Sequence, residues 1–386
     1  MWRSVASNAL TLFVVILIAL GGMIGWGQAQ YKAVGPLIDP ICLRVASGAT
    51  MVSVSADLAE NGAVTNARIL RIGADYTEKS SRLKAGSFLV PEGASMAEIV
   101  DIVTGGGQST CGTEIVYRIG VTQIGVRVRE LDPVTNRFVD VVEFDPKAEA
   151  VEVPAAFTEM RGREDTRYRV ALAEGVTSWQ VVEGLKTVEL MTGDIAVVPP
   201  EGRLAPDSYE VLVGDDRGDL LAEMESRQAK RLDEAWRNRA DGLPITTPEA
   251  ALILASIIEK ETAVPDERRR VASVFVNRLN QGMRLQTDPT VIYGVTNGQG
   301  ILGRGLRQSE LRRATPYNTY VIDGLPPTPI ANPGLASIEA ALNPEDTAFL
   351  FFVADGTGGH AFAQTLAEHN ENVAKWRAIE AEQANQ

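Results

Sequence analysis

The segment ASIIEKET (residues 255–262) ends the most apolar helix that the sequence predicts. It is preceded by Thr246-Thr247-Pro248-Glu249, and a threonine at the N-cap with a proline in the first turn is typical of a helix start. From there, residues 250–258 are apolar apart from Ser256. Helices that are apolar on all sides are normally buried, so this stretch predicts the central helix of a folded domain.

Two glutamates, Glu259 and Glu261, interrupt the apolar run. At 3.6 residues per turn they project about 200° apart, so they do not share one environment. Glu261 follows Ile257 and Ile258 by four and three residues, which places it on an apolar stripe. Glu259 lies nearer to Lys260, where solvent or an ion pair could serve it.

A carboxyl group held against apolar surface has a raised pKa and can donate a proton near neutral pH, as a general acid does. The alternative for Glu261 is a structural carboxylate bonded to a backbone amide or to an arginine such as Arg268 or Arg269, because structural networks also hold buried carboxylates. Periodicity alone favours this structural alternative.

The composition limits the classes of protein that the chain can belong to. Its 386 residues predict two or three domains, and 45% hydrophobic with 23% charged residues is typical of a globular protein. The net charge of -13 and the pI of about 4.9 argue against nucleic acid as a partner.

Residues 9–26 carry no charge and are long enough, at about 18 residues, to cross a membrane as a helix. A cleaved signal peptide is the alternative, but its apolar run is usually about 7–15 residues, and no small-x-small site precedes Gln30. We expect a cytoplasmic tail at residues 1–8 and an uncleaved single-pass anchor at 9–29, with the remainder outside the cytoplasm.

Two cysteines, Cys42 and Cys111, are present, and an even pair in an exported region permits a disulfide. We expect them to be structural or incidental. The spacing of the cysteines and of His360 and His369 matches no metal site, so no metal is expected.

The fold class that the sequence predicts is α+β. The order strand, glycine, Ser/Thr two residues later and then helix occurs three times, with strands at residues 41–45, 83–90 and 168–172. This order resembles a LysM-like glycan-binding module, although plain scaffold packing explains it equally well. We therefore expect LysM-like α/β subdomains at 40–106 and 167–216, separated by a β-rich insertion at 107–166 to which we assign no function.

Residues 217–386 are expected to form a mainly helical catalytic domain with a short strand element. Its predicted elements are helices at 218–240, 267–280 and 369–379, a strand at 349–354, and a turn at 356–362 that carries His360.

Five segments of this half, taken together, closely resemble the endolytic murein transglycosylase family of bacterial inner-membrane proteins. They are ASIIEKETAVPDERRRVASVFVNRL (255–279), GMRLQTDPTVIYG (282–294), YNTY (317–320), GLPPTPIANPG (324–334) and FVADGTGGHAF (352–362). The resemblance implies an anchored periplasmic enzyme that cleaves nascent peptidoglycan between N-acetylmuramic acid and N-acetylglucosamine, leaves 1,6-anhydro ends and acts beside the peptidoglycan polymerases (penicillin-binding proteins).

The same resemblance implies a mechanism with one carboxyl group and no cofactor. Related lytic enzymes place the acid in a Glu-Ser pair at a helix end, which Glu261-Thr262 matches and Glu259-Lys260 does not. Amide and hydroxyl groups suit sugar substituents and tyrosine rings suit sugar faces. The residues that we expect in the substrate groove on these grounds are Gln286, Thr287, Asp288, Tyr293, Asn318 and Tyr320.

Two other functions remain open at this point. One is a non-catalytic peptidoglycan-binding anchor, which would have no need for a carboxyl group on an apolar helix face. The other is a hydrolytic muramidase with Asp288 as its second carboxylate.

Overall fold

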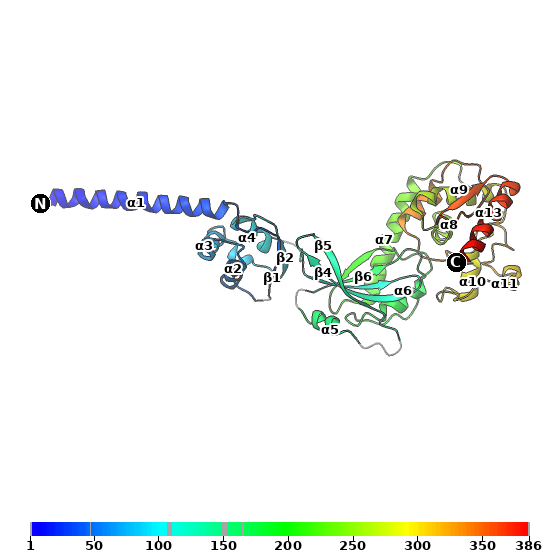
Figure 1. Ribbon diagram of the computed structural model, residues 1–386, viewed down its shortest axis with the longest axis horizontal. Helices are drawn as coiled ribbons and strands as arrows, with labels where there is room; N and C mark the ends of the chain where they lie inside the picture. Colours follow the sequence, from blue (N-terminus) through cyan, green and yellow to red (C-terminus); the bar gives the residue numbers. More distant parts are fainter. Residues whose placement is uncertain (1, 47, 106–109, 149–152, 164–165, 385–386) are drawn as a thin grey trace. The chain divides into compact units, whose positions relative to one another are not determined.

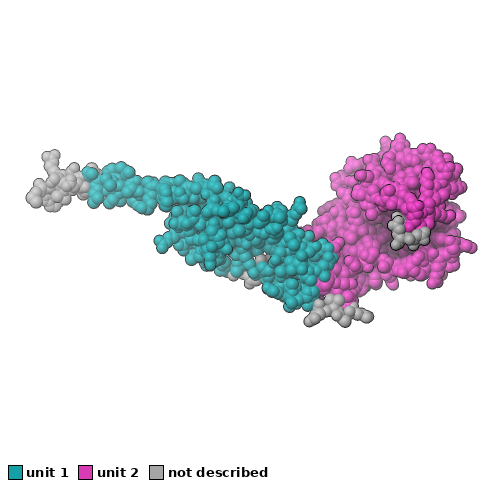
Figure 2. All heavy atoms as spheres, viewed as in Figure 1, with its two compact units in different colours: residues 1–115, 127–143, 152–167 teal, residues 116–126, 144–151, 168–386 magenta. Residues whose placement is uncertain are grey.

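The chain folds into the mixed α+β arrangement that its sequence predicts (Figure 1). The computed structural model describes residues 2–46, 48–105, 110–148, 153–163 and 166–384. Two compact units are present (Figure 2): residues 1–115, 127–143 and 152–167 form unit 1, and residues 116–126, 144–151 and 168–386 form unit 2.

Unit 1 begins with helix α1 (Trp2–Lys32), which includes the segment that we expected to be a tail. Within it, Thr11–Lys32 has a mean hydropathy of 2.0 and is long and apolar enough to cross a membrane. The end of α1 and the segment after it belong to the folded unit, because Tyr31 and Leu37 are part of its core. A Cβ atom at Gly73 would lie 2.3 Å from the Tyr31 ring, so only glycine admits this contact.

The rest of that core belongs to a small α/β module. Its elements are β1 (Ile41–Val45), α2 (Met51–Glu60), α3 (Ala67–Tyr76), a 3-10 turn (Ser80–Arg82), β2 (Gly86–Val90) and α4 (Met96–Thr104). Thr50 and Ser95 cap α2 and α4 through capping boxes, as their positions after a glycine predict. Because β1 and β2 pair antiparallel, the first two copies of the repeated pattern form one module.

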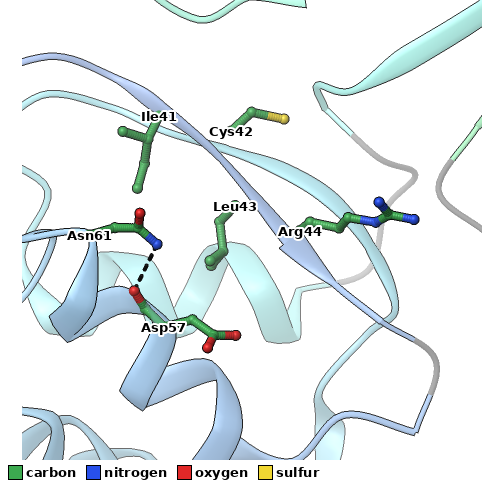
Figure 3. Close-up of a pocket in the computed structure, with 6 residues that line it drawn as sticks. All are labelled: Ile41, Cys42, Leu43, Arg44, Asp57 and Asn61. Atoms are coloured by element: carbon green, nitrogen blue, oxygen red, sulfur yellow. Dashed lines mark hydrogen bonds between the residues drawn. The ribbon is translucent and has the colours of Figure 1, made fainter.

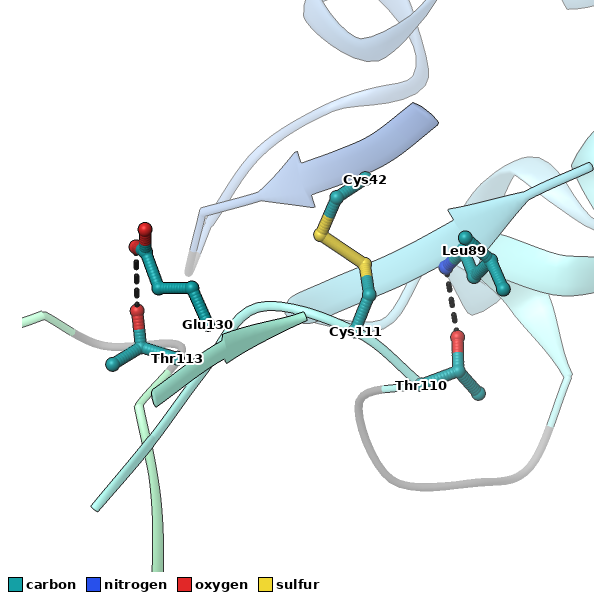
Figure 4. Close-up of a disulfide and its surroundings, with 6 residues drawn as sticks. All are labelled: Cys42, Leu89, Thr110, Cys111, Thr113 and Glu130. Carbon is teal, nitrogen blue, oxygen red and sulfur yellow. Dashed lines mark hydrogen bonds between the residues drawn. A yellow bond between two sulfur atoms is a disulfide. The ribbon is translucent and has the colours of Figure 1, made fainter. Parts of the chain in front are cut away.

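Cys42 on β1 and Cys111 form a disulfide across 69 residues of chain (Figure 4). Thr110, next to Cys111 in the chain, connects the same segment to β2, because the backbone N–H of Leu89 donates to Thr110 Oγ1 at 2.8 Å. The expected boundary at residues 106 and 107 lies outside the described residues.

A five-stranded sheet has the strand order β5-β4-β3-β6-β7. The bounds are β3 (Thr113–Ile119), β4 (Ile124–Asp132), β5 (Arg137–Phe144), β6 (Arg167–Leu172) and β7 (Ser208–Val211), with helices α5 (Ala155–Arg161) and α6 (Ser178–Leu185). Three of these strands come from the expected insertion, so that segment shares its sheet with the β6–α6 element. The expected turn after β4 is present, with Asp132 accepting hydrogen bonds from Val134 N and Thr135 Oγ1.

The C-terminal part of unit 2 is mainly helical and packs around α8 (Pro248–Glu261). Thr247 is the N-cap, and its side chain accepts a hydrogen bond from Ala250 N at 3.1 Å. Ala251, Leu254, Ile257 and Ile258 are fully buried, as the apolar run predicts. The surrounding helices are α7 (Arg217–Arg237), α9 (Arg268–Asn280) with a 3-10 turn before it (Pro265–Glu267), α10 (Asp288–Thr296), α11 (Gln308–Arg312), α12 (Leu335–Leu342) and α13 (Leu366–Ala384).

The segment that we expected to be a turn carrying His360 is partly a strand. His360 begins β9 (His360–Ala363), which pairs antiparallel with β8 (Phe351–Ala354). The turn itself is shorter and closes around Gly356 and Gly358, both at positive φ.

Candidate active site

Glu261 is the last residue of α8, and the backbone ends its helical course at Thr262. One oxygen of the Glu261 carboxyl accepts a hydrogen bond from Thr287 Oγ1. Burial is the largest influence on this carboxyl and raises its pKa above the ordinary value; the bond from Thr287 opposes that shift, and the charge of Asp288 adds to it. Burial therefore favours the protonated form of this carboxyl.

Thr287 is held in place by a buried set of threonines. Its backbone N–H donates to Thr319 Oγ1 at 3.0 Å, and the hydroxyls of Thr290 and Thr319 lie 2.8 Å apart. All three threonines are at most 3% exposed. Thr290 and Thr319 were not among the expected site residues, although both lie inside the quoted motifs.

A buried arginine supports the same loop from α9. Arg278 donates to the carbonyl oxygens of Leu285 and Leu350, both at 2.7 Å. It follows Val274 by four residues on the buried face of α9, and an arginine on an apolar face is the signal that could have identified it. Its charge favours the ionised form of Glu261 and so opposes the effect of burial.

Asp288 and Tyr320, two of the residues expected in the groove, lie close enough to Glu261 for their charges to interact with its carboxyl. The Tyr320 hydroxyl donates to Asp288 Oδ1 at 2.7 Å, and Asp288 is exposed in the first turn of α10. The exposed Gln286 precedes them at a positive φ of 52°. Its backbone N–H donates to Thr319 O at 3.1 Å.

Two other expected groove residues have different surroundings. Asn318 is fully buried, and its amide group donates to the carbonyl oxygens of Glu310, Leu311 and Arg313. Since those bonds occupy the amide, Asn318 is a structural residue that orders the loop before Tyr320. Tyr293 contacts the ring of Tyr317 at a centroid distance of 4.9 Å, and its hydroxyl donates to Glu201 Oε2 at 3.2 Å.

Glu259 interacts with the charge of Lys260 beside it, as expected, and it also has a partner that periodicity did not predict. Its Oε2 accepts a hydrogen bond from the backbone N–H of Gly334 at 2.9 Å. The two glutamates in the last turn of α8 therefore have separate partners, Gly334 for Glu259 and Thr287 for Glu261. His360 donates its backbone N–H to Glu267, and its Nδ1 lies 2.8 Å from the same carboxylate, which fits a residue that orders the β8–β9 turn.

Glu201 is a second buried carboxyl in unit 2 that sequence reasoning missed. Its Oε1 accepts hydrogen bonds from Ser178 N at 2.8 Å and from Asn332 Nδ2 at 3.4 Å, while Oε2 accepts from Tyr293. Burial raises its pKa to about 7, against the effect of these bonds. Glu201 thereby connects α6, α10 and the loop at Asn332.

We expect Glu201 to make the stability of unit 2 depend on pH. The pKa of Glu201 is higher in the folded than in the unfolded chain, so the folded state binds the proton more tightly. Protonation of Glu201 therefore stabilises the folded state, and this contribution is fully present below about pH 4.5 and is lost as the pH rises through about 7. In Glu201→Gln, which keeps a neutral side chain of the same shape, that decline should be absent.

Urea unfolding of both proteins between pH 4.5 and 8 measures the effect. The unfolding free energy of the wild type should fall relative to that of the variant by up to about 3 kcal/mol across this window. Parallel curves would contradict the assignment.

Residues 43–375 match the YceG-like family. Two relatives carry the name endolytic murein transglycosylase: the Bacillus subtilis protein is 36% identical over 178 residues, which are 46% of this chain and 48% of that protein. The protein of Streptococcus pneumoniae D39 is 34% identical over 182 residues, which are 45% of this chain and 32% of that protein.

A crystal structure of a protein from Listeria monocytogenes described as YceG-like covers 86% of this chain and 98% of its own, with 24% identity and a TM-score of 0.47. The matched segments thus span half or less of the length of the two named relatives.

Proposed function

From the premise that the chain belongs to the YceG-like family, we propose that it is an endolytic murein transglycosylase. It cleaves the β-1,4 bond between N-acetylmuramic acid and N-acetylglucosamine in nascent peptidoglycan, leaves 1,6-anhydro-N-acetylmuramic acid ends, and so limits the length of glycan strands. The relatives named endolytic murein transglycosylase support this activity.

The observation that carries the proposal is the position of Glu261, whose carboxyl ends the apolar helix α8 and accepts a hydrogen bond from Thr287. Burial at this position raises the pKa of the carboxyl. The negative end of the α8 dipole also disfavours a carboxylate at this position. A carboxyl that keeps its proton near neutral pH is what the protonation of a glycosidic oxygen requires.

In the proposed mechanism Glu261 acts first as acid and then as base. Its proton passes to the glycosidic oxygen as the bond from that oxygen to C1 of the muramic acid residue breaks. The Glu261 carboxylate then takes the proton of the C6 hydroxyl of the same sugar, whose oxygen forms the new bond to C1. Protons balance over the cycle, and no water is consumed. Asp288, Tyr320 and Gln286 are proposed to contact the sugars.

Mass spectrometry of the ends released from purified peptidoglycan tests this reaction. We expect anhydro ends, 18 mass units or so lighter than hydrolysed ends because one water is not added. Reducing ends would instead identify a muramidase that uses Asp288 as second carboxylate. The observation in favour of this alternative is that the charge of Asp288 raises the pKa of Glu261, so the two carboxyl groups are near each other. An absence of cleavage would favour the non-catalytic anchor.

We further propose that α1 anchors the chain in the inner membrane with the catalytic part, residues 217–386, in the periplasm, beside the polymerases that make the strands.

We also propose that residues 40–106 form a LysM-like module that binds glycan. A cavity of about 260 Å³ on this module supports it, with Asp57 of α2 and Asn61 at the C-terminal cap of that helix next to β1 (Figure 3).

A further inference from the structure

A second cavity, of about 290 Å³, lies in unit 2 along α10. Pro289, Ile292, Tyr293 and Thr296 line it at helical spacings of three and four, so they form one face of α10. These four residues are only half-buried, whereas Thr290 and Val291 are buried in the protein. One face of α10 therefore packs in the protein and another borders the open cavity.

Lys260 supplies the cavity with a positive charge. As neighbours on α8, Lys260 and Glu261 project about 100° apart, so one helix end serves both the cavity and the candidate acid. The Lys260 ammonium donates to Gly175 O at 3.2 Å. That is its one hydrogen bond to the described residues, and an ammonium group has three donors.

The charges around the cavity favour an anionic ligand. Lys260 and Arg304 are the cationic residues among the described lining residues, and no acidic residue is among them. Arg304 already pairs with Glu310, which leaves Lys260 as the main charge. Burial lowers the pKa of Lys260, and the charges of Glu259 and Glu201 oppose that shift and favour the ammonium form.

The walls of the cavity are held in place before any ligand enters. Thr177 Oγ1 donates to Gly298 O at 2.6 Å, and Gln180 Nε2 donates to Val121 O at 2.6 Å. The side chain of Lys260 packs against the turn at Gly175, where a Cβ atom would lie 3.5 Å from Lys260 Cδ. A pre-ordered site loses little conformational freedom on binding.

We propose that this cavity binds a carboxylate of the peptide stem of the strand, so that the chain prefers peptide-bearing strands to stripped glycan. The inference rests on the proposed function. Once the lactyl group is in amide linkage, the sugars carry no charge and the carboxylates lie on the stem. An amidase-stripped strand instead carries a free lactyl carboxylate directly on each muramic acid, so a charge-assisted bond to Lys260 distinguishes the two by the distance of the carboxylate from the sugar ring. From Asp288 to Tyr293 and Thr296 the helix rises roughly 8–12 Å, a distance that a sugar with its attached stem can span.

The first test is the preference itself. The ratio of kcat/KM on peptide-bearing strands to kcat/KM on strands stripped by an amidase should be well above one for the wild type. In Lys260→Met, which keeps the length of the side chain without its charge, the ratio should fall about 10- to 100-fold, mainly through KM on peptide-bearing strands. Lys260→Arg should restore part of it, and Lys230→Met, at an exposed lysine of α7, should leave the ratio unchanged.

The second test does not depend on catalysis. Muramyl tripeptide, titrated into Glu261→Gln and followed by calorimetry, should bind, and adding Lys260→Met should remove the binding. A wild type that cleaves both strands equally, or a neutral chitin oligosaccharide that binds as tightly as the tripeptide, would overturn the proposal. Absence of cleavage on both strands would instead refute the proposed function, and the titration would still decide whether the cavity takes the stem.

Discussion

Glu261→Gln is expected to abolish cleavage of peptidoglycan while the protein stays folded. Glutamine has the shape of glutamate and can still accept the hydrogen bond from Thr287, but it has no proton to deliver. General acid–base groups typically contribute about 10²–10⁴-fold to a rate. Because the proposed mechanism uses Glu261 in both of its proton transfers, we expect the loss to reach the upper end of that range.

Glu259→Gln on the same helix is the matched control. Glutamine can keep the bond that Glu259 accepts from Gly334, so turnover should remain within a small factor of the wild type. Release of soluble fragments, with circular dichroism to check folding, compares the two variants. Equal losses would mean that the whole helix is disturbed. A loss confined to Glu259→Gln would place the catalytic carboxyl on the other face of α8.

Loss of the Cys42–Cys111 disulfide is expected to destabilise unit 1 strongly without impairing the chemistry. The bond closes a loop with a sequence separation of 69 residues, and the chain-entropy relation for such a loop gives about 4 kcal/mol. In Cys42→Ser/Cys111→Ser we therefore expect an early unfolding transition that belongs to unit 1. Cleavage of soluble strands, which depends on residues of unit 2, should stay within a small factor.

Calorimetric scans of wild type, reduced wild type and the double variant measure this effect, alongside strand cleavage. Reduced wild type and variant should show the same shift. If the scans were unchanged, the disulfide would be dispensable for unit 1. If cleavage fell in a protein whose unit 2 remained folded, the cysteines would have a role beyond structure.

The sequence predicted those parts of the structure that depend on local patterns. Thr247 and Pro248 start α8 where a cap and a first-turn proline predict it, and Thr50, Ser95 and Thr177 each cap a helix after a glycine turn. The 3.6-residue period likewise separated Glu259 from Glu261 at the end of α8, although it did not identify Gly334 as the partner of Glu259.

Contacts between distant parts of the chain could not be predicted in this way. Glu201 takes its partners Ser178, Tyr293 and Asn332 from 23, 92 and 131 residues away, and Lys260 bonds to Gly175 across 85 residues. Asn318 was misassigned for a related reason, since residue type suggests a sugar ligand and only the folded loop reveals three carbonyl partners. Periodicity carries no information on such pairings.

The contact between Tyr31 and Gly73 determines how the chain would move in a membrane. Helix α1 has 31 residues, or about 46 Å at its rise per residue, and the hydrocarbon core takes up about 30 Å of that. Thr11–Lys32 is the apolar stretch of α1, and Tyr31 is fixed in the core of unit 1. An anchored α1 would therefore lead directly into the unit, without a flexible linker that would let the unit sample a volume around its anchor. Unit 1 of an anchored chain would then diffuse laterally, at a constant height above the bilayer.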